Sequence, residues 1–234
     1  MRIWVISDMH GFHDQIKVPV EANMVIIPGD FTNSNILYEN EAEFFKFKNW
    51  LYDLPIEHKI VVAGNHDQCM LKKYNKEDLK AMGVVYLENE SVTIEGLKIY
   101  GSPVTPTFNN WFFMCDRGKI HRYWDAIEPD TDILVTHGPP YGVFDWSDDR
   151  NHANTPKGCK ALMVAVNKVK PLLHLFGHIH NSKDIINNGV LFRDHTTFIN
   201  ASCVTDNKYH LGATSMGYLI EIEEGKIKSI NKNV

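Results

Sequence analysis

The sequence has few of the features that mark secreted mini-proteins, membrane proteins and duplex-binding proteins. Its four cysteines are widely spaced and form no Cys-x-x-Cys pair, so no disulfide framework is expected. No apolar run approaches the roughly 18 residues of a membrane-spanning helix, and the run Ile3–Ile6 is too short for a signal peptide. A formal net charge of -5 disfavours a broad basic surface for duplex nucleic acid. These absences predict a cytoplasmic protein without a membrane or duplex nucleic acid as partner.

The chain also has no internal repeat of roughly 20–50 residues and no biased tract, which excludes solenoid and low-complexity proteins. Its hydrophobic fraction of 44% and charged fraction of 23% are those of an ordinary globular protein. A chain of 234 residues is long enough for one large α/β domain and short for two. We therefore expect residues 1–234 to form a single domain, while the sequence leaves the oligomeric state open.

Short apolar runs that end in polar clusters predict buried strands. There are five of them: Ile3–Ile6, Met24–Ile27, Ile60–Ala63, Ile133–Val135 and Leu172–Phe176. Helical spacing predicts helices over Glu41–Leu54, over a segment capped by Asn75 and ended by Gly83, and over Lys157–Val169. Because strands alternate with helices, the pattern indicates an α/β fold with parallel strands and right-handed crossovers.

Turn residues between short apolar runs predict three hairpins, so the last third of the chain is expected to be mostly antiparallel. The expected pairs are Ser91–Ile94 with Leu97–Tyr100, Ile185–Ile186 with Val190–Phe192, and Tyr218–Ile222 with Lys226–Ile230. Two further stretches, Ser102–Gly118 and Gly138–Pro156, are rich in Pro, Asn, Asp and aromatic residues. Long ordered loops of this kind are commonly functional in compact domains.

Each of the five apolar runs is followed by a side chain that can bind a metal ion. The clusters are Asp8-Met9-His10, Gly29-Asp30, Gly64-Asn65-His66-Asp67, Thr136-His137-Gly138 and Gly177-His178-Ile179-His180. One Gly-Asp after a strand is ordinary turn chemistry, whereas five clusters in order are not. Since ligands of open α/β sheets bind outside the carboxyl ends of the strands, we expect the five clusters to converge at one edge.

The candidate ligands offer oxygen and nitrogen donors and no thiolate. They are Asp8, Asp30, Asn65, His10, His137, His178 and His180. This set exceeds the four ligands of a tetrahedral zinc and suits two cations about 3.5–4 Å apart, bridged by a carboxylate. Asp30, which stands alone after Gly29, is the candidate bridge. The expected metals are Mn, Fe or Zn; the softness of the ligands does not discriminate among them, and Mn is the one we favour.

The ordered set resembles the calcineurin-like metallophosphoesterase superfamily from Asp8 to His180. This resemblance implies one metal bound by Asp8, His10, Asp30 and His180, and a second bound by Asp30, Asn65, His137 and His178. It also implies an α/β fold of two mixed β-sheets packed as a sandwich and flanked by helices, rather than one doubly wound sheet. A closer resemblance is to the metallophosphoesterase-domain-containing subfamily first described from fetal brain, whose members resemble cyclic-nucleotide phosphodiesterases. The residues that carry it are Gly101-Ser102-Pro103 followed by Pro106, Phe108, Trp111 and Arg117-Gly118, and His137-Gly138-Pro139-Pro140 with Gly158-Cys159.

The activity implied is hydrolysis of phosphodiester bonds, or of monoesters, in a small nucleotide-like ester. A hydroxide that bridges two cations would be the nucleophile. His66 is the expected general acid, since it adjoins Asn65 without being needed as a ligand, and Asp67 is expected to orient its imidazole. The alternative is that His66 only contacts phosphate or packs behind Asn65.

The two long loops are expected to carry substrate specificity. Trp111 and Tyr141 are candidates for stacking on a base, and Arg117 is a candidate for pairing with phosphate. The alternative is that the loop aromatics close the core. His174 lies inside an apolar run and is expected to be a core residue rather than a ligand.

Two other functions are compatible with the sequence. The same metal centre would serve a single-strand nuclease, although the acidic net charge argues against one. A metal-binding scaffold without activity is a third class, and the presence of all the ligand histidines argues against it.

Overall fold

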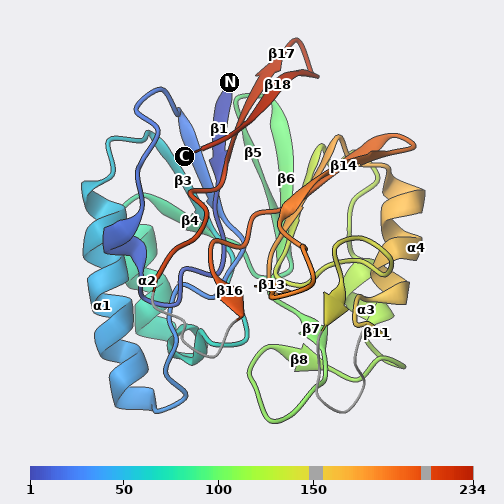
Figure 1. Cartoon of the computed structure of the whole chain (residues 1–234). Coiled ribbons are helices and arrows are strands. Elements are labelled where there is room, and N and C mark those ends of the chain that lie inside the picture. Colours follow the sequence, from blue (N-terminus) through green and yellow to red (C-terminus); the bar gives the residue numbers. More distant parts are fainter. Residues whose placement is uncertain (148–154, 207–211, 234) are drawn as a thin grey trace.

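Two six-stranded β-sheets form the centre of the molecule (Figure 1). The computed structural model describes residues 1–147, 155–206 and 212–233. The first sheet, in the order β18-β17-β1-β2-β3-β4, consists of β1 (Arg2–Val5), β2 (Met24–Ile27), β3 (His58–Val61), β4 (Val84–Tyr86), β17 (Tyr218–Glu223) and β18 (Lys226–Lys232). The second, in the order β14-β15-β12-β9-β6-β5, consists of β5 (Glu90–Ile94), β6 (Leu97–Ser102), β9 (Ile133–Thr136), β12 (Leu173–Phe176), β14 (Gly189–Arg193) and β15 (Thr196–Asn200).

Both sheets have a parallel centre. Strands β1 to β4 run parallel, while β17 and β18 extend that sheet in antiparallel fashion. In the second sheet β6, β9, β12 and β15 are parallel, and the two edge strands β5 and β14 are antiparallel. The mixed two-sheet fold implied by the resemblance is confirmed. Strand and helix alternation alone, which indicated one doubly wound sheet, gave the wrong architecture.

The sheets pack face to face, and side chains alternate between the inner and outer faces of each strand. Ile3 and Val5 of β1 point inward, where they join Ile133 and Leu175 of the second sheet in one buried cluster. Trp4, between them, belongs instead to the cluster beneath the outer helices. Because both faces of the central strands are covered, these strands are continuous apolar runs without polar alternation.

Helices cover the outer faces of the sandwich. Figure 1 shows α1 (Leu37–Asp53) and α2 (Lys73–Ala81) on one side, and α3 (His121–Trp124) and α4 (Lys160–Val169) on the other. Phe44 and Phe47 of α1 are buried against the first sheet, and Leu162 and Val166 of α4 against the second. Two short 3₁₀ helices, η1 (His13–Gln15) and η2 (Gln68–Leu71), lie in the loops of the first sheet. Within the described residues no helix combines the length and apolar character needed to span a membrane.

The predicted helices exist, but their starts differ from the prediction. α1 begins at Leu37 rather than Glu41, and α4 begins at Lys160, where the Cys159 thiol accepts a hydrogen bond of 3.4 Å from the Leu162 amide. Asn75 is not a cap: it is buried inside α2, and its Nδ2 donates to the Cys69 carbonyl at 2.7 Å. Gly83 follows α2 with φ +74°, as expected of a terminating glycine.

Two of the three hairpins are confirmed, and their turns use left-handed residues. Glu95 and Gly96 join β5 to β6 with positive φ, and Glu224 and Gly225 join β17 to β18 likewise.

The hairpin expected between Ile185–Ile186 and Val190–Phe192 is wrong, because β14 pairs with β15 instead. Asn187 and Asn188 do not form a turn. The side-chain amide of Asn187 donates to the His180 carbonyl and that of Asn188 to the Ser202 carbonyl, and these bonds hold the preceding loop.

Short strand pairs give the remaining loops regular contacts. These are β7 (Thr105–Pro106) with β8 (Met114–Cys115), β10 (Trp146–Ser147) with β11 (Thr155–Pro156), and β13 (Asn181–Ser182) with β16 (Thr205–Asp206). The first two pairs lie within the two predicted functional loops. The second of those loops is described only up to residue 147 and from residue 155 onward.

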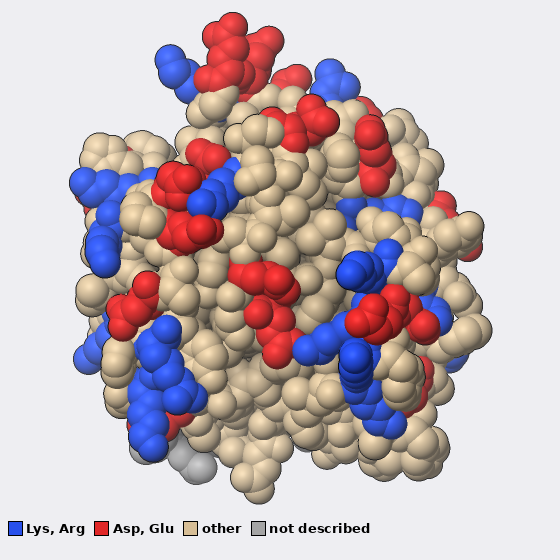
Figure 2. Space-filling model, turned by 180° about the vertical axis from the view of Figure 1, so that it is seen from behind, with Lys and Arg blue, Asp and Glu red and all other residues tan. Residues whose placement is uncertain are grey.

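Charged side chains of both signs are interspersed on the face of the molecule shown in Figure 2. Among the described residues, Lys98 Nζ lies 2.8 Å from Asp130 and 3.0 Å from Glu128. Exposed pairs of this kind contribute at most about 1 kcal/mol each, so the stability of the fold comes from the buried apolar clusters.

Candidate metal centre and the adjoining pocket

The seven predicted ligands meet at the edge where the parallel strands end. Three groups of side chains have ligand atoms within 4.8 Å of one another: Asp8, His10 and His180; His10, Asp30 and His66; and Asp30, His137 and His178. Asn65 joins the third group, because its Oδ1 lies 2.9 Å from Nε2 of His137. Residues separated by some 170 positions therefore form one cluster, as the strand-end pattern predicted.

The backbone at this edge is strained. Four candidate ligands have backbone φ angles in the left-handed region, which residues other than glycine rarely adopt. The angles are 56° at Asp8, 43° at His10, 52° at Asp30 and 70° at His178. Each such residue costs on the order of 1 kcal/mol or more, and such strain gathers at functional sites. Hydrogen bonds across the edge hold it, among them the Asp8 amide to Gly29 O at 3.0 Å and the His10 amide to Asp30 O at 2.9 Å.

The first half of the centre joins Asp8, His10 and His180. Nε2 of His180 lies 3.3 Å from Oδ1 of Asp8 and 3.3 Å from Nε2 of His10. Burial raises the pKa of Asp8, but the hydrogen bond and charge of His180 outweigh it, and the pKa falls below its ordinary value. Burial lowers the pKa of His10 to about 4. A carboxylate and a neutral imidazole are the forms that bind a metal ion.

The second half joins Asn65, His137 and His178 to Asp30. Nδ1 of His137 lies 2.8 Å from the carbonyl oxygen of Pro28, which can only accept, so Nδ1 carries the proton and Nε2 faces the cluster. Metal-binding histidines are commonly held by such a bond. Burial lowers the pKa of His137, but the charge of Asp30 outweighs it and raises the pKa to about 9. The positive charge of protonated His137 therefore balances the negative charge of Asp30, which is the role that a bound cation would take.

Three glycines stand at positions where any side chain would collide with a candidate ligand. A Cβ on Gly29 would lie 2.6 Å from Nδ1 of His137, one on Gly64 would overlap Oδ1 of Asp30, and one on Gly177 would overlap the Asp8 carboxylate. Carboxylates, a carboxamide and imidazoles packed this closely are balanced by divalent cations. The residues present therefore fit the metal ions that the resemblance implies.

Asp67 does not touch the ring of His66, so its predicted role in orienting that imidazole is wrong. Its buried carboxylate accepts hydrogen bonds from the amides of Asp30 at 2.8 Å, Gly64 at 2.7 Å and Thr32 at 2.9 Å, and from the Thr32 hydroxyl at 2.7 Å. Burial and the charge of Asp30 raise its pKa to about 7. Asp67 thus fixes the backbone that carries Asp30 and Asn65.

His66 is oriented by the backbone and by an aromatic neighbour. Its Nδ1 lies 2.7 Å from the carbonyl oxygen of Asn33, and its amide donates to Oδ1 of Asp30 at 2.8 Å. The ring of Trp111 packs over the imidazole with centroids 4.1 Å apart. Trp111 therefore contacts the candidate acid; it does not itself line the pocket beside the cluster, so its expected stacking on a base stays a prediction. Neither the Asn33 carbonyl nor this contact with His66 could be identified from residue types.

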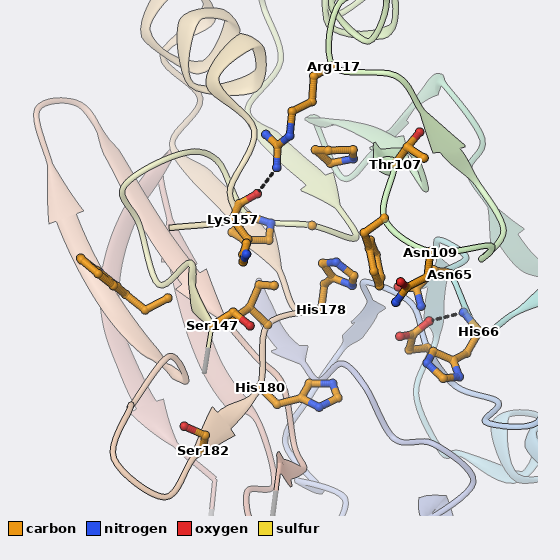
Figure 3. Close-up of a pocket in the computed structure, with 17 residues that line it drawn as sticks. Asn65, His66, Thr107, Asn109, Arg117, Ser147, Lys157, His178, His180 and Ser182 are labelled. Atoms are coloured by element: carbon orange, nitrogen blue, oxygen red, sulfur yellow. Dashed lines mark hydrogen bonds between the residues drawn. The ribbon is translucent and has the colours of Figure 1, made fainter. Parts of the chain in front are cut away.

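A pocket of about 640 Å³ opens beside the ligands and is lined by both predicted loops (Figure 3). The first loop contributes Thr107, Phe108 and Asn109, and the second contributes Trp146 and Ser147. The Phe108 ring lies 5.2 Å from that of His178, so an apolar surface adjoins the metal centre directly. The volume is within the range of small-molecule sites.

Arg117 lines this pocket, but its guanidinium is already engaged. Nη1 donates to Gly158 O at 2.9 Å and Nη2 to Lys157 O at 2.6 Å, which ties the first loop to the segment that directly follows the second (Figure 3). Tyr141 does not line the pocket: its ring lies under Lys160 Nζ at 5.0 Å. Tyr141 is therefore not carried forward as a substrate residue. His174, in β12, is fully buried against Phe176 and Phe198 with Nε2 2.9 Å from the Thr136 hydroxyl, which confirms it as a core residue.

A two-sheet α/β sandwich with an oxygen and nitrogen cluster at its strand ends defines a metal-dependent hydrolase of phosphate esters. The sequence matches the profile of the calcineurin-like phosphoesterase family over residues 1–182, and the chain belongs to this family. It is 35% identical to human metallophosphoesterase domain-containing protein 1, over 88% of this chain and 67% of that protein. A UPF0046 protein of Caenorhabditis elegans is 32% identical over 97% of this chain and 84% of its own length.

Solved structures with little sequence similarity share the fold. One superposes with a TM-score of 0.67 at 13% identity and covers 99% of this chain and 98% of that chain. A protein from Staphylococcus aureus assigned as a 5′-nucleotidase superposes with a TM-score of 0.53 at 14% identity, over 99% of this chain and 52% of that chain. These similarities support the fold alone.

Proposed function

We propose that this metallophosphoesterase cleaves phosphodiester bonds of a small nucleotide-like ester and holds two divalent transition-metal ions, preferably Mn²⁺, with Fe and Zn as alternatives. The observation that carries the proposal is Oδ2 of Asp30, which faces His137 at 3.3 Å and His10 at 3.8 Å. One carboxylate oxygen between two donor sets is the arrangement that suits two cations about 3.5–4 Å apart. The remaining ligands divide into Asp8, His10 and His180 for one ion, and Asn65, His137 and His178 for the other.

When bound, such cations supply a water of lowered pKa as the nucleophile and neutralise charge on the phosphoryl oxygens. His66 then acts on the leaving group. The form that acts is the imidazolium, which carries a proton on both nitrogens; because its Nδ1 proton is committed to the Asn33 carbonyl, the proton for transfer is the one on Nε2, and the neutral ring protonated on Nδ1 remains. The bond between phosphorus and the leaving oxygen breaks, and that oxygen takes the proton. General acids of this kind contribute about 10²–10⁴ in rate.

The pocket supports a diester rather than a simple phosphate as substrate. It extends from His66 and Asn65 past His178 to Arg117 and Lys157, so there is space beyond the candidate metal centre for a second substituent of the phosphate (Figure 3). Phe108 and Trp146 supply flat apolar surfaces on which a base or ribose can rest. This combination of a metal centre with aromatic walls favours nucleotide-like esters.

A substrate panel tests the proposal. Metal-free protein is reconstituted with Mn²⁺ and offered bis-p-nitrophenyl phosphate, p-nitrophenyl phosphate, cyclic mononucleotides and single-stranded DNA. We expect small diesters to be cleaved at least about ten-fold faster than the monoester. His66→Asn is expected to keep its metals and to slow esters with poor leaving groups by about 10²-fold or more, while activated aryl esters slow far less.

The other outcomes separate the alternatives. Faster cleavage of single-stranded DNA than of small diesters would establish a nuclease. Metal-loaded, folded protein that turns over none of these substrates would establish a scaffold. Equal losses on both kinds of ester in His66→Asn would remove His66 as the acid.

A further inference from the structure

The loop between β2 and α1 controls the ring of His66 through one backbone carbonyl. Asn33, in this loop, places its carbonyl oxygen 2.7 Å from Nδ1 of His66. A carbonyl oxygen only accepts hydrogen bonds, so this contact requires the proton on Nδ1. In a neutral ring that choice leaves Nε2 as the unprotonated nitrogen. The position of the Asn33 carbonyl therefore decides which ring nitrogen exchanges a proton at the pocket.

Asn33 cannot hold this position by burial, because it is exposed. It is held instead from α1. Oε2 of Glu43, in the second turn of that helix, accepts the amides of Asn33 at 2.7 Å and Ser34 at 2.9 Å. Two backbone donors on one carboxylate oxygen fix the peptide planes on either side of Asn33, and with them the direction of its carbonyl.

The same helix also holds the backbone of His66. Nδ2 of Asn40, which is fully buried, lies 2.8 Å from the His66 carbonyl and 2.7 Å from the Ser34 carbonyl. Asn40 thus ties the loop to the His66 segment, while Glu43 aims the loop at the His66 ring. The two side chains are neighbours on one face of α1, about one helical turn apart.

We infer that Glu43 is a positioning residue for His66: it holds the Asn33 carbonyl that fixes the ring and tautomer of the general acid. The inference rests on the proposed role of His66 for its catalytic consequence, but not for its structural content. Glu43 contacts neither the pocket nor the metal ligands among the described residues. Residue type and sequence position would not identify it as part of the active site.

A purely structural role for Glu43 predicts something different. A carboxylate that only stabilises the loop would lower the stability of the protein when removed, and all substrates would be affected alike. A positioning role predicts a change in the tautomer of one histidine and a loss confined to substrates that need the acid. The ring tautomer and the dependence on the leaving group therefore distinguish the two roles.

Three substitutions and one matched control make the test. Glu43→Ala removes the acceptor, Glu43→Asp keeps the charge on a side chain too short to reach, and Glu43→Gln keeps both the length and an accepting oxygen. Glu41→Ala is the control, since Glu41 carries the same charge on the same helix but contacts Lys72 at 3.3 Å and Asn75 at 3.1 Å.

The first readout needs no metal and no substrate. Long-range ¹H–¹⁵N spectra of the imidazoles are recorded on metal-free protein at about pH 8, where an ordinary histidine is neutral, and His66→Asn assigns the signal. We expect the Nδ1-protonated tautomer in the wild type, in Glu41→Ala and in Glu43→Gln. In Glu43→Ala and Glu43→Asp we expect a large shift toward the Nε2-protonated form. An unchanged tautomer in both of these variants would overturn the inference, and if the Ala variant does not fold, the Asp variant decides.

The second readout is kinetic and separates this inference from the proposed function. With Mn²⁺ bound, Glu43→Asp is expected to lower kcat about ten-fold on a diester with a poor leaving group and less than about two-fold on an activated aryl diester, with KM unchanged. Glu43→Gln should restore most of the loss. If the tautomer shifts but neither ester slows, Glu43 positions His66 as inferred, and the role of His66 as the acid fails.

Discussion

Oδ2 of Asp30 lies 3.3 Å from Nε2 of His137, with the carboxylate and the imidazole both almost completely buried. The other oxygen of Asp30 accepts the amide of His66 at 2.8 Å. One side chain therefore connects the metal centre to the segment that carries the candidate acid. Burial raises the pKa of Asp30, but the charge of His137 outweighs it and holds the pKa well below its usual range, so the carboxylate is ionised.

Replacing this carboxylate tests whether one residue serves both halves of the centre. Asp30→Asn removes the negative charge but keeps the shape, and we expect it to lose bound metal and to lower diester turnover at least about 100-fold, since even outer partners of metal ligands contribute 10–100-fold. Metal content after desalting and turnover of bis-p-nitrophenyl phosphate measure the two effects. Asp130→Asn, on the surface, is the control. Full metal content together with normal turnover would contradict the assignment of Asp30.

The glycine beside the metal centre provides a second, steric test. A Cβ at Gly177 would overlap the Asp8 carboxylate and Ser7, whereas a Cβ at Gly96 would meet nothing within 4 Å. Gly177→Ala is therefore expected to weaken metal binding at least about ten-fold. Gly96→Ala, at φ +78°, should lower the free energy of unfolding by about 1–2 kcal/mol through backbone strain alone.

Chelator competition and urea unfolding of the metal-free protein separate the two glycine effects. Equal metal affinities in Gly177→Ala and Gly96→Ala would show that the backbone near Gly177 can adjust around Asp8. A loss of affinity in both variants would show that general destabilisation, and not the local overlap, weakens metal binding.

The clustering of the candidate metal ligands could be predicted from the sequence because its signal is local. Each of the five clusters directly follows an apolar run, and the parallel ends of those strands meet at one edge. His137 and His178 could be identified as candidate ligands from their positions just after β9 and β12 alone. The glycines at 29, 64 and 177 strengthened the pattern, and the structure shows why: each is in close contact with a ligand side chain.

The remainder of the site depends on contacts that leave no mark on residue types. A backbone carbonyl, that of Asn33, orients His66, while Asp67, the charged residue next to His66, turns inward to three backbone amides. The hairpin expected at residues 185–192 failed for a similar reason, because Asn187 and Asn188 use their side chains to hold a loop. Polar residues near turns have several possible partners, and only the tertiary structure selects among them.

The packing of the Trp111 ring against His66 predicts a selective loss when the indole is removed. Aromatic contacts of this kind contribute about 0.5–1.5 kcal/mol, so Trp111→Leu should lower kcat by about 2–10-fold on esters with poor leaving groups. Activated esters should be much less affected, and Trp111→Phe should retain most of the rate. Tyr141→Leu is the control, because the Tyr141 ring lies against Lys160 and not against His66. A larger loss in the Tyr141 variant than in the Trp111 variant would reverse the assignment of the two aromatics.

His174 predicts how the stability of the metal-free protein depends on pH. Burial lowers its pKa to about 3, against about 6.5 in the unfolded chain. Above pH 6.5 the ring is neutral in both the folded and the unfolded state, so its contribution to the free energy of unfolding is fully present. As the pH falls from about 6.5 toward about 3, the unfolded chain binds a proton that the folded protein excludes, so the free energy of unfolding decreases. The slope approaches about 1.4 kcal/mol per pH unit.

His174→Leu should remove this part of the acid sensitivity. The ring packs against Phe176 and Phe198, so an apolar replacement suits the site, and the Thr136 hydroxyl keeps a partner because it also donates to Gly138 O at 2.7 Å. Between pH 7 and pH 5, urea unfolding of the metal-free wild type should lose about 2 kcal/mol more than that of the variant. His195→Gln, at an exposed position, gives the background. Parallel pH profiles for wild type and His174→Leu would contradict this prediction, because they would show that His174 takes up its proton inside the folded protein. The two phenylalanine rings and the single hydroxyl around the imidazole offer little to stabilise that positive charge.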